Sequence, residues 1–442
     1  MHGMSIEPLI IPRSDHTISR DNISESALKV LYRLHKAGFA SYLVGGCVRD
    51  MLLNRNPKDF DVATDAHPEE IRKLFRNCRL IGRRFRLAHI RFGREIIEVA
   101  TFRGHHDPEG EGDNITDDGI ITRDNEYGTL EEDAFRRDFR VNGLYYNIAD
   151  FSVVDYVGGL DDLKQGVLHV IGDAQARLKE DPVRILRAVR FAAKLDFKFD
   201  DDLEQGVDKV APLLLQVSSA RMFDEVLKLF MSGHGLATYK VFKKYNLLQY
   251  LFAETNKLLD KNNYNQFLEQ ALFNTDERIQ AGKPVTPAFL YAAMLWPVVE
   301  SHREIFTNAD MTPLQGLQTA GIEAITSCAD QIMIPKRFRF PMREIWNMQA
   351  RLEKHNGRQI FKLMAQPRFR AAYDFLLLRA QSNAELEQAA QWWTELIDAD
   401  ADSQRKMIQA CTPNRNRRSR HNKNKKKSEP HTNTPPSDKS ST

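Results

Sequence analysis

The sequence predicts an α+β protein with a small N-terminal mixed sheet covered by helices, followed by an all-helical body and a disordered basic tail. Short strand-like apolar segments alternate with helical ones up to about residue 172. From residue 173 onward, apolar residues recur at spacings of three and four almost throughout. Residues 413–442 contain nine Lys or Arg, two acids and no large apolar residue, so burial cannot offset the entropy cost of ordering them.

The elements of the first part follow from capping signals and hydrophobic patterns. Asn22, three residues before Glu25, predicts the start of a helix that ends at Gly38. Beyond it, strands are predicted over residues 41–44, 59–63, 84–92, 95–102 and 141–148, and helices over residues 47–53 and 68–75. Residues 107–133 hold eleven acids and no sustained period, which predicts mostly a solvated loop.

Composition excludes several classes of protein. Hydrophobic residues make up 42% and charged residues 28% of the 442-residue chain, so most of it can fold around a core. The longest apolar stretch, residues 289–299, contains Pro297 and is about half the length of a membrane-spanning helix. No secretory signal is visible, and the four cysteines show no zinc or disulfide spacing. We therefore expect a cytoplasmic protein with reduced thiols and no integral membrane contact.

The net charge of +3 is unevenly distributed along the chain. The tail, residues 413–442, carries a surplus of +7 and leaves residues 1–412 mildly acidic. A mobile cationic segment attracts nucleic acid through phosphate neutralisation, without sequence specificity. The alternative is a tail that serves solubility alone.

A glycine pair follows the first predicted strand of the sheet, in Leu43-Val44-Gly45-Gly46-Cys47-Val48-Arg49-Asp50. Gly45 and Gly46 allow backbone N–H groups to approach an anion, and Arg49 can bind phosphate oxygens with two nitrogens. The spacing matches neither a P-loop nor a dinucleotide motif, and a simple tight turn is the alternative interpretation.

Asp59 and Asp61 are two residues apart in a predicted strand, so both side chains should project from one face. Two neighbouring carboxylates repel each other unless a cation neutralises them, and oxygen ligands suit Mg²⁺. A third carboxylate would complete a two-metal site for in-line displacement. Asp138 is the first candidate, beside Arg137, which could meet a triphosphate. Glu98 is its rival, and the sequence does not decide between them.

A later helix is predicted to begin with Asp181 as its N-cap and Pro182 in its first turn. Arg184, Arg187 and Arg190 then form a stripe along one side of it. Asp181 and Arg184 together could read the edge of adenine or cytosine, because one accepts and the other donates a hydrogen bond. A merely solvated arginine face is the alternative.

These motifs, in this order, resemble the class II nucleotidyltransferases of the polymerase β superfamily, which comprise tRNA CCA-adding enzymes and bacterial poly(A) polymerases. The resemblance covers roughly residues 41–195. It implies that Asp59, Asp61 and Asp138 are catalytic and bind metal. It also implies that nucleotide is bound by Gly45, Gly46, Arg49, Arg137, Asn142, Asp181, Arg184, Arg187 and Arg190.

The segment Leu80-Ile81-Gly82-Arg83-Arg84-Phe85-Arg86-Leu87-Ala88-His89-Ile90 resembles the stretch that marks the poly(A) polymerase branch. That branch implies template-independent transfer of AMP from ATP to RNA 3′ ends, with Mg²⁺, or Mn²⁺ in its place, as cofactor. The implied partners are single-stranded RNA 3′ ends and RNA-decay proteins, not DNA. A CCA-adding enzyme that uses CTP and ATP is the alternative, and a small-molecule nucleotidyltransferase or a non-catalytic RNA-binding protein is a further one.

The resemblance also suggests a division of labour along the chain. We expect a catalytic head in residues 1–172, a helical neck that binds nucleotide and RNA in residues 173–260, a helical RNA-binding body in residues 261–412, and the tail in residues 413–442. Two basic segments of the body, residues 336–339 and 368–370, are expected to follow the RNA backbone, and a merely solvated surface is the alternative.

Overall fold

The computed structural model describes residues 7–82, 86–104, 127–308, 311–354 and 359–411. The predicted basic tail and most of the acidic stretch therefore lie outside the described residues. The chain forms two compact units. Unit 1 comprises Met1–Ala253, Leu272–Pro284 and Ala329–Met333, and unit 2 comprises Glu254–Ala271, Val285–Cys328 and Ile334–Thr442. These units divide the chain differently from the predicted head, neck and body, a division that stays a prediction.

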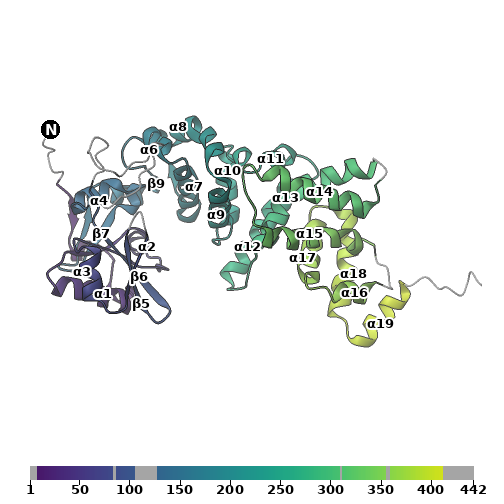
Figure 1. The fold of residues 1–442 in the computed structure, drawn as a ribbon, viewed down its shortest axis with the longest axis horizontal. Coiled ribbons are helices and arrows are strands. Elements are labelled where there is room, and N and C mark those ends of the chain that lie inside the picture. Colours follow the sequence, from purple (N-terminus) through teal and green to yellow (C-terminus); the bar gives the residue numbers. More distant parts are fainter. Residues whose placement is uncertain (1–6, 83–85, 105–126, 309–310, 355–358, 412–442) are drawn as a thin grey trace, which may run out of the picture. The chain divides into compact units, whose positions relative to one another are not determined.

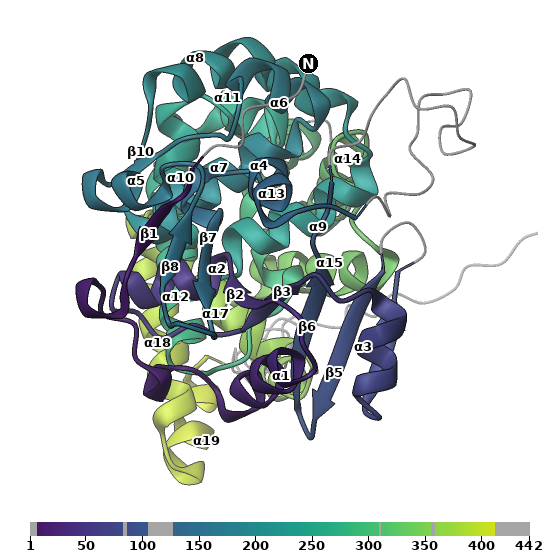
Figure 2. The ribbon, with the colours of Figure 1, turned by 90° about the vertical axis from the view of Figure 1, so that its left-hand side faces the viewer.

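Unit 1 contains an eight-stranded mixed sheet, which Figure 2 shows from β1 toward β5. The strands are β1 (Leu9–Ile11), β2 (Ser41–Val44), β3 (Asp61–Thr64), β4 (Cys78–Ile81), β5 (Leu87–Phe92), β6 (Glu95–Thr101), β7 (Leu144–Asn147) and β8 (Val153–Asp155). Their order is β1-β8-β7-β2-β3-β6-β5-β4, and within this sheet only β3 and β6 run parallel. The central strands β2, β3 and β6 are thus brought together from different parts of the sequence.

Capping side chains explain where the first helices begin. Helix α1 (Glu25–Lys36) starts after Ser24, whose side chain accepts a hydrogen bond from Ala27 N, so the predicted cap at Asn22 is wrong by two residues. Helices α2 (Gly46–Leu52) and α3 (Pro68–Leu74) lie within one residue of their predicted bounds. The buried stripe of α1 packs on the sheet together with the inner faces of β2, β3 and β6.

The structure corrects three of the strand and loop predictions. Strand β3 begins at Asp61, so Asp59 precedes the strand. The predicted strand over residues 141–148 is shortened to β7, because Arg140–Asn142 form a 3-10 turn. The described end of the acidic stretch is helix α4 (Leu130–Arg136), which Thr129 and Glu132 cap reciprocally. Strand β4 was not predicted as a separate element.

Helices follow the sheet in unit 1, in agreement with the predicted change of pattern (Figure 1). They are α5 (Gly159–Gln165), α6 (Ala174–Glu180), α7 (Val183–Leu195), α8 (Asp201–Val210), α9 (Ser219–Phe230) and α10 (Gly235–Lys244), with a short parallel pair of β9 (Val167–Leu168) and β10 (Lys198–Phe199). Helix α7 ends where Asp196 adopts φ 62°, a left-handed cap. The predicted α+β fold class, with a mixed sheet followed by helices, is confirmed.

Unit 2 is helical throughout its described residues. Its helices are α11 (Ala253–Leu258), the first part of α12 (Tyr264–Gln280), α13 (Pro287–Asn308), α14 (Pro313–Cys328), α15 (Lys336–Leu352), α16 (Ile360–Met364), α17 (Phe369–Ala380), α18 (Glu387–Asp398) and α19 (Ala401–Ala410). Large apolar side chains such as Trp296, Trp346 and Trp393 are fully buried among them. Among the described helices, none is long and apolar enough to cross a membrane.

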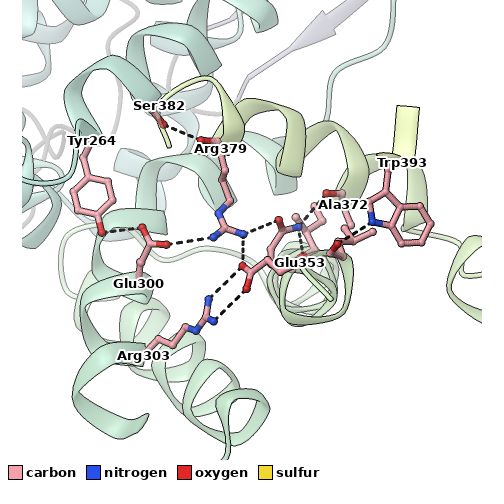
Figure 3. A network of polar contacts seen from close by, with 11 residues as sticks. Tyr264, Glu300, Arg303, Glu353, Ala372, Arg379, Ser382 and Trp393 are labelled. Carbon is pink, nitrogen blue, oxygen red and sulfur yellow. Dashed lines mark hydrogen bonds and ion pairs between the residues drawn. The ribbon is translucent and has the colours of Figure 1, made fainter. Parts of the chain in front are cut away.

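A buried polar network ties four of these helices together (Figure 3). Arg379, 4% exposed, donates to Glu353 at 2.8 Å and to Glu300 at 3.3 Å. Arg303 binds the other Glu353 oxygen at 3.3 Å, and the Tyr264 hydroxyl donates to Glu300 at 2.9 Å. Every charge therefore faces an opposite charge, which buried ionic groups require.

Candidate active site

Three features meet at one end of the central strands. Val44, the last residue of β2, pairs with Asp61, the first residue of β3. Asp61 in turn pairs with Glu98 of the parallel strand β6. Because the glycine turn follows Val44 directly, the turn and the Asp61 and Glu98 carboxylates lie at the same region of the sheet. Sheet pairing alone thus assembles part of the candidate site.

The pKa of the Asp61 carboxyl is raised to about 6. The main cause is that the surrounding protein removes water from the carboxylate, although one side of the residue remains exposed. The negative charges of Glu98 and Asp59 act in the same direction, and Arg137 opposes them. Asp59 is exposed just before the strand. Asp59, Asp61 and Glu98 therefore form a group of like charges that a cation would relieve.

Asp138 is held elsewhere by a different set of partners. Its Oδ2 atom accepts hydrogen bonds from Arg187 Nε at 2.8 Å and Nη2 at 2.5 Å. Its Oδ1 atom accepts from Phe139 N at 2.9 Å and from Asn142 Nδ2 at 3.1 Å. Over the part of the chain that the structure describes, no three His, Cys, Asp or Glu side chains are grouped so that they could hold a metal ion. Neither Asp138 nor Glu98 therefore completes a three-carboxylate cluster with Asp59 and Asp61 among the described residues, and the identity of the third carboxylate stays a prediction.

Glu98 has a partner on the neighbouring strand. His89 of β5 is its cross-strand neighbour, and His89 Nε2 lies 3.2 Å from Glu98 Oε1. The Glu98 side chain is 47% exposed, so part of it remains free to bind a ligand. Glu98 is the carboxylate in register with Asp61 on the neighbouring strand.

The glycine turn packs against Arg137. Gly45 adopts φ +76°, a conformation that L side chains rarely adopt, and a Cβ atom on Gly45 would lie 3.5 Å from Arg137 Nη1. Arg137 donates to Tyr145 OH at 3.0 Å and to Asp133 Oδ2 at 2.9 Å. Burial alone would lower the pKa of Arg137. Its contacts with Tyr145 and Asp133 outweigh burial and hold that pKa above its usual range. A fixed cation thus faces the turn and the Asp61 carboxylate.

The structure places Arg49 differently from the sequence prediction. It is only 2% exposed, and it binds Asp50 Oδ1 at 2.8 Å through Nε and Asn142 Oδ1 at 2.6 Å through Nη1. Its guanidinium also lies over the Phe191 ring, 5.2 Å from the ring centre. A hydrogen-bond chain therefore runs from Arg49 through Asn142 and Asp138 to Arg187 on α7.

The predicted base-reading residues on α7 are engaged with other side chains. Asp181 Oδ2 accepts from Arg221 of α9 at 2.8 Å, and Asp181 Oδ1 caps Val183 N. Arg184 Nη1 binds Glu180 at 2.8 Å and also the Arg177 carbonyl. Helix α7 begins at Val183 with Pro182 as its N-cap, one residue later than predicted.

The last arginine of the stripe lies beside an aromatic ring. Arg190 stacks over Phe191 at 5.3 Å, and burial, followed by the charge of Arg187, lowers its pKa. Sequence reasoning assigned no role to Phe191, Arg221, Asp133 or Tyr145. Phe191 could have been noticed because it directly follows Arg190, whereas the other contacts join residues that are distant in sequence.

Comparisons with known proteins decide the family. Three family models match the chain: "Poly A polymerase head domain" over residues 41–169, "Probable RNA and SrmB- binding site of polymerase A" over residues 196–259, and "Polymerase A arginine-rich C-terminus" over residues 309–427. Poly(A) polymerase I of Salmonella typhimurium is 48% identical over 409 residues, which cover 90% of this chain and 88% of that relative. The chain belongs to the poly(A) polymerase I family.

CCA-adding enzymes are more distant from this family member. That of Lactobacillus helveticus is 35% identical over 216 residues, which cover 49% of this chain and 52% of that enzyme. The structure of the Thermotoga maritima CCA-adding enzyme complexed with tRNA shares the fold, with a TM-score of 0.62 and 18% identity over 88% of this chain and 87% of that one. The family predicted from the sequence motifs is confirmed, and within it the poly(A) polymerase branch.

Proposed function

We propose that this poly(A) polymerase family member adds AMP from ATP to RNA 3′ ends without a template and releases pyrophosphate. The observation that carries the proposal is the match over nearly the whole chain to a poly(A) polymerase I, whereas the similarity to CCA-adding enzymes spans about half of it. It is thus a polynucleotide adenylyltransferase.

A divalent cation fits the carboxylates at the end of the central strands. Mg²⁺ in proteins is usually held by one or two carboxylates together with substrate phosphates, so a complete protein cage is not needed. We assign Asp59 and Asp61 as the ligands of Mg²⁺, with Mn²⁺ as an alternative ion. The pKa of Asp61, raised first by burial and then by the negative charges of Glu98 and Asp59, supports this assignment, because a bound cation would relieve both effects. When bound, the ion would neutralise the triphosphate and favour ionisation of the attacking hydroxyl.

We propose Glu98 as the third carboxylate, with Asp138, the residue predicted from the sequence, as the alternative. Glu98 is in register with Asp61, whereas both oxygens of Asp138 already accept hydrogen bonds. Asp138 becomes a positioning residue instead. It orients Arg187, and so helix α7, relative to the sheet.

The basic residues of the site divide into binding and positioning groups. Arg137 faces the glycine turn and Asp61, which suits it to bind the triphosphate. Gly45 and Gly46 leave room for phosphates beside it. Arg49 is buried and holds Asn142, so it acts by fixing the turn rather than by touching nucleotide.

Asp181 and Arg184 remain our candidates for reading the base. Both lie at the start of α7, and ATP binding would replace their present partners, Arg221 and Glu180. Arg187 and Arg190 follow on the same helix and would contribute positive charge toward the nucleotide. This arrangement accepts adenine, and a CCA-adding activity with CTP as well as ATP is the second candidate.

We propose single-stranded RNA 3′ ends as the partner, with RNA-decay proteins as further partners and the cytoplasm as the place of action. The match of residues 196–259 to an RNA-binding family model favours RNA. The cationic residues 413–442 would raise the local RNA concentration without base specificity.

The test is incubation of the purified protein with an unstructured RNA, Mg²⁺ and one nucleotide at a time. Long tails with ATP and little product with CTP are expected. Addition restricted to tRNA ends, with both CTP and ATP consumed, would support the CCA-adding alternative. RNA binding without incorporation of any nucleotide would contradict both.

A further inference from the structure

Helix α15 of unit 2 has one strongly basic side. At about 100° per residue, Lys336, Arg337, Arg343 and Arg351 fall within about 120° of the helix surface. The opposite side is apolar and packs into the unit through Met342, Ile345, Trp346, Met348 and Leu352. Lys354 follows the last turn at the end of the basic side. We call these five cations the α15 basic face.

The cations of this face lack acidic partners among the described residues. None of Lys336, Arg337, Arg343, Arg351 and Lys354 forms an ion pair there, and the Nε atom of Arg343 is buried without a hydrogen-bond partner. The one acid on this side, Glu344, faces Arg368 at 3.6 Å. Elsewhere in the unit, Arg303, Arg379 and Arg405 each face an acid. The positive charge of the face is therefore available to an external anion.

An exposed aromatic ring lies within the same face. Phe340 is 65% exposed, the highest value among the exposed large hydrophobic residues of the described chain. Its direction from the helix axis differs by about 20° from that of Arg351 and by about 60° from those of Arg337 and Arg343. An exposed ring among cations offers a surface on which a nucleic-acid base can stack.

A small hollow adjoins the C-terminal end of the face. It has a volume of about 170 Å³, and Arg351 and Lys354 line it together with the apolar side chains of Ile360, Leu363 and Trp393. From Lys336 to Lys354 the face extends over about 27 Å at 1.5 Å per residue. This length suits several nucleotides of an extended strand rather than one small anion.

We propose that the α15 basic face binds single-stranded RNA. Cations that follow the phosphates, combined with an exposed ring on which a base stacks, are the features that recognise single strands without sequence preference. This inference rests on the proposed function, since it takes the same RNA as its ligand. Of the segment predicted to follow RNA, the proposal uses Lys336 and Arg337 and leaves out Arg339, which is bound to the Ile334 carbonyl.

The charge part of the proposal is tested with the triple variant Lys336→Gln/Arg337→Gln/Arg351→Gln of the full chain. Binding of a fluorescent oligoadenylate is measured by anisotropy over a range of salt concentrations. We expect the slope of log Kd against log salt to fall by about 2, and binding at about 0.1 M salt to weaken tenfold or more. The control Lys257→Gln/Arg405→Gln/Lys406→Gln removes the same charge from elsewhere in the unit.

The stacking part is tested with Phe340→Ala, which should weaken oligoadenylate binding about five- to 150-fold with little change in the salt slope. Phe273→Ala, at another exposed phenylalanine, is the matched control. The melting temperature and the KM for ATP should stay unchanged in every variant.

These measurements separate the inference from the proposed function. If the unaltered protein binds oligoadenylate but does not extend it with ATP, the proposed function fails. If it extends RNA and the α15 variants bind oligoadenylate as tightly as their controls, the inference alone is overturned. The α15 variants could instead keep their affinity for oligoadenylate and lose affinity for an acidic polypeptide such as polyglutamate. That result would assign the α15 basic face to a protein partner and would also overturn the inference.

Discussion

Arg187 on α7 binds a single oxygen of Asp138 with two nitrogens, Nε at 2.8 Å and Nη2 at 2.5 Å. The pair connects the turn before β7 to the helix that carries the candidate base-reading residues. Asp138 is 11% exposed and Arg187 is 44% exposed at their side chains, so water weakens the pair only from one side. The contact therefore joins Asp138 to α7, and a metal ion bound by Asp138 would have to replace it.

The Asp138–Arg187 pair can be measured by a double-mutant cycle. Asp138→Asn, Arg187→Gln and the double variant are compared by urea unfolding. We expect a coupling free energy of about 1 kcal/mol, because the two groups contact each other directly and one is partly exposed. Strictly additive effects of the two substitutions would show that the contact contributes nothing.

The choice between Glu98 and Asp138 is tested by the Mg²⁺ dependence of AMP incorporation. Glu98→Gln should raise the Mg²⁺ concentration for half-maximal activity by roughly tenfold, because it removes a carboxylate beside Asp61. Asp138→Asn should leave that concentration nearly unchanged and affect ATP use instead. The reverse pattern would restore Asp138 as the third carboxylate.

The two glycines of the turn should respond differently to alanine. Gly45→Ala places a side chain at φ +76° and should destabilise the fold by about 1 to 2 kcal/mol. Gly46→Ala meets only Arg49 Nη2 at 3.5 Å, an ordinary contact, so its melting temperature should stay near that of the unaltered protein. Its KM for ATP should rise, since the methyl group takes space assigned to phosphate. An unchanged KM would remove Gly46 from the nucleotide site.

The polar network of unit 2 predicts a pH dependence of stability. Burial alone would raise the pKa of Glu353, but Arg379 and Arg303 outweigh it and hold the pKa below the usual 4.5. The stabilisation is therefore fully present above about pH 4.5 and is lost as the pH falls through the lowered pKa. Glu353→Gln should destabilise the protein at pH 7 by about 3 kcal/mol, because Arg379 stays buried without its main partner.

Urea unfolding at pH 7 and below pH 4 checks this prediction. The difference between the Glu353→Gln variant and the unaltered protein should shrink at the lower pH. Glu387→Gln, at an exposed acid of the same unit, should show little difference at either pH. A pH-independent loss from Glu353→Gln would mean that packing, not charge, explains the effect.

Sequence reasoning was accurate where the signal is local. Strand β2 has its predicted bounds, since Ser41–Val44 is an apolar run closed by glycine. It does not reveal which distant residue a side chain contacts. Asp138 pairs with a residue 49 positions away, and nothing near Asp138 in the sequence distinguishes an arginine partner from a metal ion. The roles assigned to Arg49 and Glu98 depend in the same way on burial and strand pairing.

The central claim is that Asp59 and Asp61 bind the cation that drives nucleotide addition. Tail synthesis by the Asp61→Asn variant tests it most directly. The folded protein raises the pKa of the Asp61 carboxyl, which means that it disfavours the charged form. Replacing Asp61 by the neutral Asn should therefore not lower the melting temperature. We predict intact oligoadenylate binding, an unchanged or higher melting temperature, and a loss of AMP incorporation of roughly a thousandfold or more. Long poly(A) tails made by a folded Asp61→Asn protein would contradict the assignment.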